Sequence, residues 1–211
     1  DHPIVRKGLA QLIDQEPDLT VCAETGTPRE ALALTADRDP DTVVVDVSLG
    51  GVSGIQLVKD LVARHADLPI LVLSMHDESL YAERALQAGA KGYIMKEEAT
   101  DAVITAIRTV LRGDYYFSDQ MARRIFQRAA SGRKADSQPP LAALSDRELE
   151  VYDLVGRGLP TREIARKLHL SIKTVETHQA HIKKKLGLEN NIQLIRHAAQ
   201  WSRTDPPGQD S

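Results

Sequence analysis

Short apolar runs alternate with helical patterns along the first half of the chain, and this alternation limits the folds that the chain can adopt. The apolar runs lie at residues 19–23, 42–45, 69–73 and 91–95. Helical patterns, with apolar residues three or four positions apart, lie at 3–15, 28–36, 54–64, 79–88 and 99–111. The run Val43-Val44-Val45 is apolar on both faces of a strand, as in parallel sheets that are covered by helices on both sides. The pattern predicts a doubly wound α/β domain.

The residues at the predicted helix ends support this pattern. Thr27 is suited to an N-cap, with Pro28 at the first helical position and Glu30 at the third. Gly89 is typical of the residue that follows a helix. The helix at 3–15 differs from the others because no strand stands before it in this sequence. We therefore expect that the natural chain begins earlier, and that the first strand of the sheet is missing here.

A segment of small and polar residues divides the chain. Residues 129–143 end in a proline pair followed by a short Leu-Ala-Ala stretch, a composition typical of a linker. Residues 1–130 carry 14 basic and 20 acidic residues, a net charge of -6, whereas residues 131–211 carry 13 and 10, a net charge of +3. Between Arg157 and Lys185, 8 basic residues meet only 2 acidic ones. This stretch suits either a solvated helix face or a polyanionic partner.

The composition excludes several classes of protein. With 42% hydrophobic and 27% charged residues, the chain is typical of a globular protein and not of a disordered one. Its longest apolar runs, Val43–Val45 and Ile70–Leu73, are far shorter than the roughly 18 residues of a membrane span. A single cysteine, Cys22, cannot form an internal disulfide, and no signal segment follows Asp1. These features predict a cytoplasmic protein without a membrane partner.

Polar and charged residues follow the predicted strands, at the edge of the sheet where ligands bind in open α/β folds. These residues are Asp1, Asp46, Ser74 and Lys96. Taken singly, the first three suit turns or helix caps, and Lys96 suits a surface lysine. Together they offer carboxylates for Mg²⁺, a hydroxyl group and a cation for phosphoryl oxygens. These are the requirements of phosphoryl transfer to a carboxylate.

The first domain resembles the receiver domain of two-component response regulators. The resemblance rests on Val43-Val-Val-Asp46, Leu49, Gly54, Leu73-Ser74, Ala88-Gly-Ala-Lys-Gly-Tyr93 and Met95-Lys96. The opening Asp1-His-Pro-Ile-Val-Arg6 is similar to that of the NarL/FixJ subgroup. The resemblance implies a flavodoxin-like parallel sheet over residues 1–116, from which the first strand and the first acidic residue of the family's pair are absent. Gly50 stands where the family commonly has proline.

The same resemblance assigns roles to individual residues. Asp46 would accept the phosphoryl group, and Asp1, Asp46 and the carbonyl of Ser48 would bind Mg²⁺. Lys96 would pair with the phosphoryl group, while Ser74 and Tyr93 would move with the switch. Tyr93 also suits a plain core aromatic at a strand end.

The second domain shows helical patterns only. Ser145-Asp-Arg-Glu148 is a capping box before a helix that carries Leu149, Tyr152 and Val155. Thr161 is expected to cap a short helix to Leu168, His169-Leu170 to form a turn, and Ser171 to cap a longer helix that Gly187 ends. This order predicts a helix-turn-helix. Val175, Ile182 and Leu186 mark the expected buried face of the longer helix. The expected DNA contacts are Thr161, Ser171, Lys173, Thr174, Glu176, Thr177, Ala180, His181 and Lys184.

Residues 141–201 resemble the LuxR-type DNA-binding domain. The motifs are Leu144-Ser-Asp-Arg-Glu-Leu-Glu-Val151, Gly158, Glu163-Ile-Ala165, Leu168, Ser171, Thr174-Val-Glu-Thr-His178, Ile182 and Lys185-Leu186. Pro160-Thr161 replaces the family's usual Ser-Asn. Glu176 stands where many members have lysine, which suits a base reader or a selectivity filter. His178 and His181 suit packing or phosphate contacts better than a metal site, and Trp201 suits the core.

Together the two halves predict a phosphorylation-controlled DNA-binding transcription regulator, and not an enzyme. We expect a receiver over 1–116, a linker helix and flexible linker over 117–143, a helix-turn-helix domain over 144–203 and a disordered tail over 204–211. The resemblance implies a sensor histidine kinase, double-stranded DNA and a second copy of the chain as partners. A phosphate-independent regulator with the same DNA-binding domain is the main alternative.

Other classes fit less well. A phosphatase of the haloacid dehalogenase type usually needs a second Asp where this chain has Ser48. A nucleotide-binding dehydrogenase needs G-x-G-x-x-G, which residues 50–54 do not match. Binding of RNA or single strands is disfavoured because aromatic residues make up only 4% of the chain.

Overall fold

The computed structural model describes residues 2–49, 52–75, 78–130 and 140–204. The chain divides into two compact units, Asp1–Ile125 and Phe126–Ser211. The expected flexible linker lies largely at 131–139, and the expected tail largely at 205–211, both outside the described residues. None of the described helices is long and apolar enough to cross a membrane.

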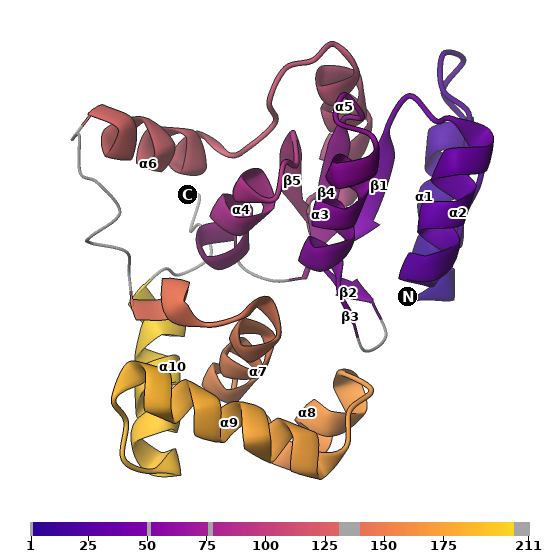
Figure 1. The fold of residues 1–211 in the computed structure, drawn as a ribbon. Coiled ribbons are helices and arrows are strands. Elements are labelled where there is room, and N and C mark those ends of the chain that lie inside the picture. The colour runs from indigo at the N-terminus through magenta and orange to yellow at the C-terminus, as the bar shows by residue number, and fades with distance from the viewer. Residues whose placement is uncertain (1, 50–51, 76–77, 131–139, 205–211) are drawn as a thin grey trace. The chain divides into compact units, whose positions relative to one another are not determined.

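A parallel sheet lies at the centre of the first unit (Figure 1). Its strands are β1 (Val43–Asp46), β4 (Ile70–Ser74) and β5 (Gly92–Met95), in the order β1-β4-β5. Every residue of β4 is buried, as expected for a central strand covered on both faces. The helices are α1 (Pro3–Asp14), α2 (Pro28–Arg38), α3 (Gly54–Arg64), α4 (Glu78–Gln87) and α5 (Ala99–Leu111). The predicted α/β class is therefore confirmed.

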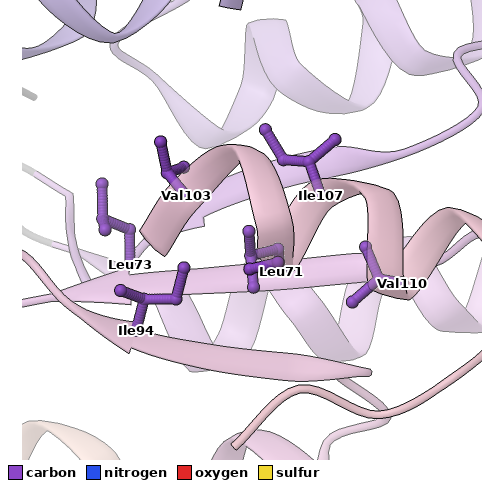
Figure 2. Close-up of a cluster of buried hydrophobic side chains, with 7 residues drawn as sticks. Leu71, Leu73, Ile94, Val103, Ile107 and Val110 are labelled. Atoms are coloured by element: carbon purple, nitrogen blue, oxygen red, sulfur yellow. The ribbon is translucent and has the colours of Figure 1, made fainter. Parts of the chain in front are cut away.

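The strands and α5 share a hydrophobic core (Figure 2). Leu71, Leu73 and Ile94 project from β4 and β5 toward Val103, Ile107 and Val110 of α5. The three α5 residues recur at intervals of four and three, so they form one stripe along the helix. Burial of each such side chain stabilises the folded state by about 1.5–3 kcal/mol relative to leaving it exposed. This packing holds the carboxyl ends of the strands in register.

The predicted strand at 19–23 is wrong. Residues 18–25 are described, and they form no strand. Their backbone groups bond locally instead: Leu19 N donates to Glu16 O at 3.2 Å, and Val21 N donates to the Asp14 carboxylate at 2.7 Å. A cavity of about 440 Å³ separates this segment from β1, and Val44 and Cys22 are among its lining residues. Without a neighbouring strand, apolar residues alone do not produce a sheet ladder.

A short antiparallel hairpin, which the sequence patterns did not predict, follows β1. It consists of β2 (Ser48–Leu49) and β3 (Val52–Ser53). Gly54, directly after β3, lies so close to β1 that a Cβ atom there would be 1.9 Å from the carbonyl oxygen of Asp46. Glycine at position 54 therefore allows the chain to return against the end of β1.

The first unit continues beyond α5 along β5. Tyr116 forms a parallel bridge with Gly92, and Tyr93 N donates to Tyr116 O at 2.9 Å. Helix α6 (Asp119–Ala130) follows, and its Met121 is buried. The start of the expected linker region is thus an ordered part of the first unit.

The second unit is helical. It contains the 3-10 helix η2 (Pro140–Ala143) and the helices α7 (Asp146–Gly156), α8 (Thr161–Lys167), α9 (Ile172–Leu186) and α10 (Asn191–Thr204). The capping box at Ser145 and Glu148 is confirmed, as are the Ser171 N-cap and the left-handed Gly187 at the end of α9. His169, with φ 53°, forms the turn between α8 and α9.

Two expectations for this unit need correction. Pro160, and not Thr161, is the N-cap of α8, and Thr161 is the first helical residue. The extended ψ of 152° at Pro160 places the proline just outside the helix. Leu186 is only half-buried, because it is the last residue of α9, beside the cap residue Gly187. Leu141, in η2, is buried.

Candidate functional site

Asp46 and Lys96 form an ion pair at the carboxyl end of the sheet. Asp46 is the last residue of β1, and Lys96 directly follows β5. The Lys96 Nζ atom lies 2.6 Å from Oδ2 of Asp46, and the two side chains are 9% and 15% exposed. Charge-assisted hydrogen bonds of this length are stronger than neutral ones. The structure thus brings together two residues that are 50 positions apart in the sequence.

The parallel register produces this meeting. Asp46 is paired with Leu73 in β4, and Ser74 with Met95 in β5, so the three strands end at the same edge. Lys96 N donates to the carbonyl oxygen of Ser74 at 2.7 Å, which holds the start of the next loop against β4. Ser74 is fully buried at this edge.

Tyr93 lies within β5, paired with Val72, and only 2% of it is exposed. Tyr93 is thus part of the core of the first unit.

The Asp46 carboxylate has a second anchor. Ser48 N donates to Oδ1 at 3.1 Å, while Lys96 binds Oδ2. Each carboxylate oxygen is therefore oriented by a different donor. A carboxylate held in this way can act as a nucleophile toward phosphorus, with the lysine balancing charge on the phosphoryl oxygens.

The residues expected to bind a metal are only partly described. Asp1 lies outside the described residues, as does Gly50. Among the residues that are described, no group of three His, Cys, Asp or Glu side chains is placed to hold a metal ion. Asp46 nevertheless fits Mg²⁺ in kind, because it offers hard carboxylate oxygens at the sheet edge.

Helix α9 presents most of the residues expected to contact DNA. Ser171, Lys173, Glu176, Thr177, Ala180, His181 and Lys184 are exposed, and Thr174 is half-buried. Val175 and Ile182 are fully buried on the opposite face, as expected. Thr161 is half-buried in α8, where its hydroxyl accepts a hydrogen bond from Gln179 at 3.4 Å.

Buried charges attach α9 to α7. Glu148 is 4% exposed and accepts hydrogen bonds from Lys185 Nζ and Ser145 N, each at 2.7 Å. Nδ1 of His181 lies 3.6 Å from the same carboxylate. Burial raises the pKa of Glu148, but the bonds from Lys185 and Ser145 outweigh this effect and hold its pKa below the usual value. Burial lowers the pKa of His178.

The sequence patterns did not predict two contacts that attach α9 to α7 and α8. Gln179 is 8% exposed and connects α9 to α8 through Thr161. Its position four residues after Val175 could have placed it on the buried face. The pairing of Glu148 with Lys185 had no local signal, because 37 residues separate the partners.

Comparison with known proteins shows the family. Residues 1–108 match the response regulator receiver domain, and residues 142–198 match the bacterial regulatory proteins of the luxR family. The chain therefore belongs to the two-component response regulators that combine a receiver domain with a LuxR-type regulatory domain. The predicted family is confirmed.

Two curated relatives span nearly the whole chain. Oxygen regulatory protein NreC of Staphylococcus carnosus is 36% identical over 209 residues, which cover 97% of this chain and 96% of NreC. Transcriptional regulatory protein UhpA of Escherichia coli is 40% identical over 196 residues, 93% of each chain.

Solved structures agree with the assignment. RcsB from Salmonella enterica serovar Typhimurium, bound to promoter P1flhDC in the presence of phosphomimetic BeF3-, has a TM-score of 0.60 at 26% identity, and the match covers 94% of this chain and 95% of that chain. A LuxR-family response regulator from Aurantimonas sp. SI85-9A1 has a TM-score of 0.57 at 35% identity over 62% of this chain and 93% of that chain.

Proposed function

We propose that this response regulator accepts a phosphoryl group on Asp46, and that phosphorylation controls its binding to double-stranded DNA through α9. The observation that carries the proposal is the Asp46–Lys96 pair, with Nζ 2.6 Å from Oδ2 at the carboxyl end of the sheet. This edge is where open α/β sheets bind their ligands.

The phosphoryl donor is a phosphohistidine of a sensor histidine kinase. An oxygen of Asp46 attacks the phosphorus, the O–P bond forms, and the P–N bond breaks with its electron pair passing to the imidazole. Lys96 balances the charge on the phosphoryl oxygens. Ser48 N, already bonded to Oδ1, keeps the carboxylate oriented.

Mg²⁺ is the proposed cofactor of this transfer. Asp1, Asp46 and the carbonyl of Ser48 would hold it through hard oxygen ligands. When bound, the ion supplies positive charge that offsets the phosphoryl oxygens. Phosphorylation of Asp46 should therefore stop when EDTA removes divalent ions.

The switch passes through Ser74 and Tyr93. Ser74 ends β4, four residues before α4 begins at Glu78. A movement of its hydroxyl toward a phosphoryl group on Asp46 would displace the segment that leads into α4. Tyr93, already buried on the neighbouring strand, would repack when Ser74 moves. The added charge thereby shifts an equilibrium between two states.

The second unit binds DNA with α9 in the major groove. Thr161, Ser171, Lys173, Thr174, Glu176, Thr177, Ala180, His181 and Lys184 contact bases or phosphates. Solved structures of RcsB bound to a promoter, and of two RcsB dimers bound to two parallel DNAs, support DNA binding and a homodimer. We place the protein in the cytoplasm and assign it no catalytic turnover.

The test is phosphorylation by a small donor. The protein, expressed from its own coding sequence with any residues that precede Asp1, is incubated with acetyl phosphate and Mg²⁺ and weighed intact. One added phosphoryl group in the parent and none in Asp46→Asn supports the proposal. The lack of uptake in both, even with a cognate kinase, would favour the phosphate-independent regulator instead.

A further inference from the structure

The outward face of α9 carries a large apolar side chain at its start. Ile172 is the first residue of α9 and is 46% exposed. Glu176 and Ala180 follow at intervals of four, so the three residues form one stripe, and both are exposed. Ile182 on the same helix is fully buried. Ile172 is therefore an apolar residue that the fold leaves available to a partner of this face.

Two of the three hydroxyl protons near Ile172 are already used within this part of the helix. Thr177 Oγ1 donates to the carbonyl oxygen of Lys173 at 2.9 Å. Ser171 Oγ accepts from Thr174 N at 3.0 Å and shares a hydrogen bond of 2.7 Å with Thr174 Oγ1. These hydroxyl groups thus offer few donors to the edge of a base.

The remaining polar groups divide by charge. Lys173 and Lys184 are compact cations, which suit phosphate oxygens. The carboxylate of Glu176 repels phosphate and accepts hydrogen bonds only, so the stripe that it shares with Ile172 suits the floor of the groove and not its walls. In the major groove, apolar side chains contact the C5 methyl group of thymine, and carboxylates accept from the amino group of cytosine.

We propose that Ile172 is a specificity residue that recognises thymine in the operator by contact with its C5 methyl group. The proposal rests on the DNA binding of α9 proposed above. Glu176, one turn further along the stripe, keeps this part of the helix directed to bases.

The experiment removes the methyl group from the DNA. The full chain, treated with acetyl phosphate, first selects a duplex from a random pool. Each thymine of the selected half-site is then replaced in turn by deoxyuridine, which differs only in lacking the C5 methyl group. For the parent, Ile172→Ala and Ile192→Ala, the dissociation constant of the uracil duplex is divided by that of the thymine duplex. Ile192 is the matched control, since it is 70% exposed but lies in α10.

At one thymine, we expect the uracil duplex to bind the parent about fourfold more weakly, the effect of losing one buried methyl-sized group. The ratio should fall to about one in Ile172→Ala and stay at the parent value in Ile192→Ala. Because each ratio compares two duplexes on one protein, changes in folding or dimerisation cancel.

Two results would overturn the assignment of Ile172 and leave DNA binding intact. They are a parent ratio of one at every thymine, and an unchanged ratio in Ile172→Ala. If the parent enriches no duplex at all, the proposed DNA-binding function itself fails.

Discussion

Glu78, the first residue of α4, accepts hydrogen bonds from both the backbone amide and the hydroxyl of Ser118, 40 residues later. Ser118 Oγ in turn accepts from Met121 N at 3.1 Å, so Ser118 caps α6 while it is held by α4. The segment between Ser74 and α4 is the one that the proposed switch displaces. The Glu78–Ser118 contact therefore joins the start of α4 to the start of α6.

Ser118→Ala should loosen the start of α6. Loss of a serine N-cap costs about 1 kcal/mol, so the amides at the start of α6 should exchange with solvent roughly fivefold faster. Hydrogen exchange with mass spectrometry measures this. Ser118→Asn can still cap the helix and should restore most of the protection. Equal exchange in all three proteins would show that the contact contributes nothing to α6.

Lys96→Met should slow phosphorylation of Asp46. The variant keeps a long unbranched side chain but removes the cation that balances the phosphoryl charge. We expect the rate of phosphorylation to fall on the order of 100-fold. Intact mass spectra recorded over time with acetyl phosphate and Mg²⁺ give the rate. Lys91→Met is the control, because Lys91 stands before β5 with its ammonium 4.9 Å from the ring centroid of Tyr115. A rate in Lys96→Met equal to that of Lys91→Met would contradict the role of Lys96.

Gly54→Ala should destabilise the first unit by about 1–3 kcal/mol. The added Cβ would meet the carbonyl oxygen of Asp46, which is backbone and cannot rotate away. Gly8→Ala should instead stabilise the chain by about 0.5–1 kcal/mol, because, apart from its chain neighbours and the nearby backbone of α1, no described atom lies within 4 Å of that Cβ position. Urea unfolding followed by circular dichroism measures both changes. If Gly54→Ala leaves the midpoint unchanged or raises it, the close approach of Gly54 to β1 is wrong.

Glu148 should make the second unit sensitive to acid. The pKa of Glu148 is held below the usual value in the folded state, so its contribution to the free energy of unfolding is complete at neutral pH. That contribution is lost as the pH falls below about 4.5, the ordinary value for a glutamate, and the carboxylate takes up a proton. Glu148→Gln should therefore be less stable than the parent at pH 7, and the difference should narrow toward pH 3.

Urea unfolding at each pH measures these stabilities. Trp201 provides the fluorescence signal, because it is the single tryptophan of the sequence and lies in α10. Glu176→Gln removes an exposed carboxylate from α9 and serves as the control. A constant difference between Glu148→Gln and the parent from pH 7 to pH 3 would show that Glu148 is not the acid-sensitive group.

The sequence predicted those features that depend on local chemistry. The bounds of α3 and α5 agree with the pattern, since apolar spacing reports directly which side of a helix is buried. The caps at Thr27, Ser145 and Ser171 were also evident, because a cap involves residues only three positions apart.

Features that depend on distant partners were less accessible. The segment at 19–23 has the composition of a strand, but a strand also requires a neighbour to bond with. The meeting of Asp46 with Lys96 was expected from the rule that parallel strands end at one edge. The link from Glu148 to Lys185 was not, because no general rule brings α7 and α9 together at those two positions.

The segment that joins α1 to α2 gives the protein an attachment point for a reporter group. Cys22 lies in this segment, is exposed and is the single cysteine of the printed sequence. A maleimide dye or a nitroxide spin label would therefore react at one position of this sequence without prior removal of other cysteines. Its emission or spectral line shape would follow changes in the segment between α1 and α2 in real time.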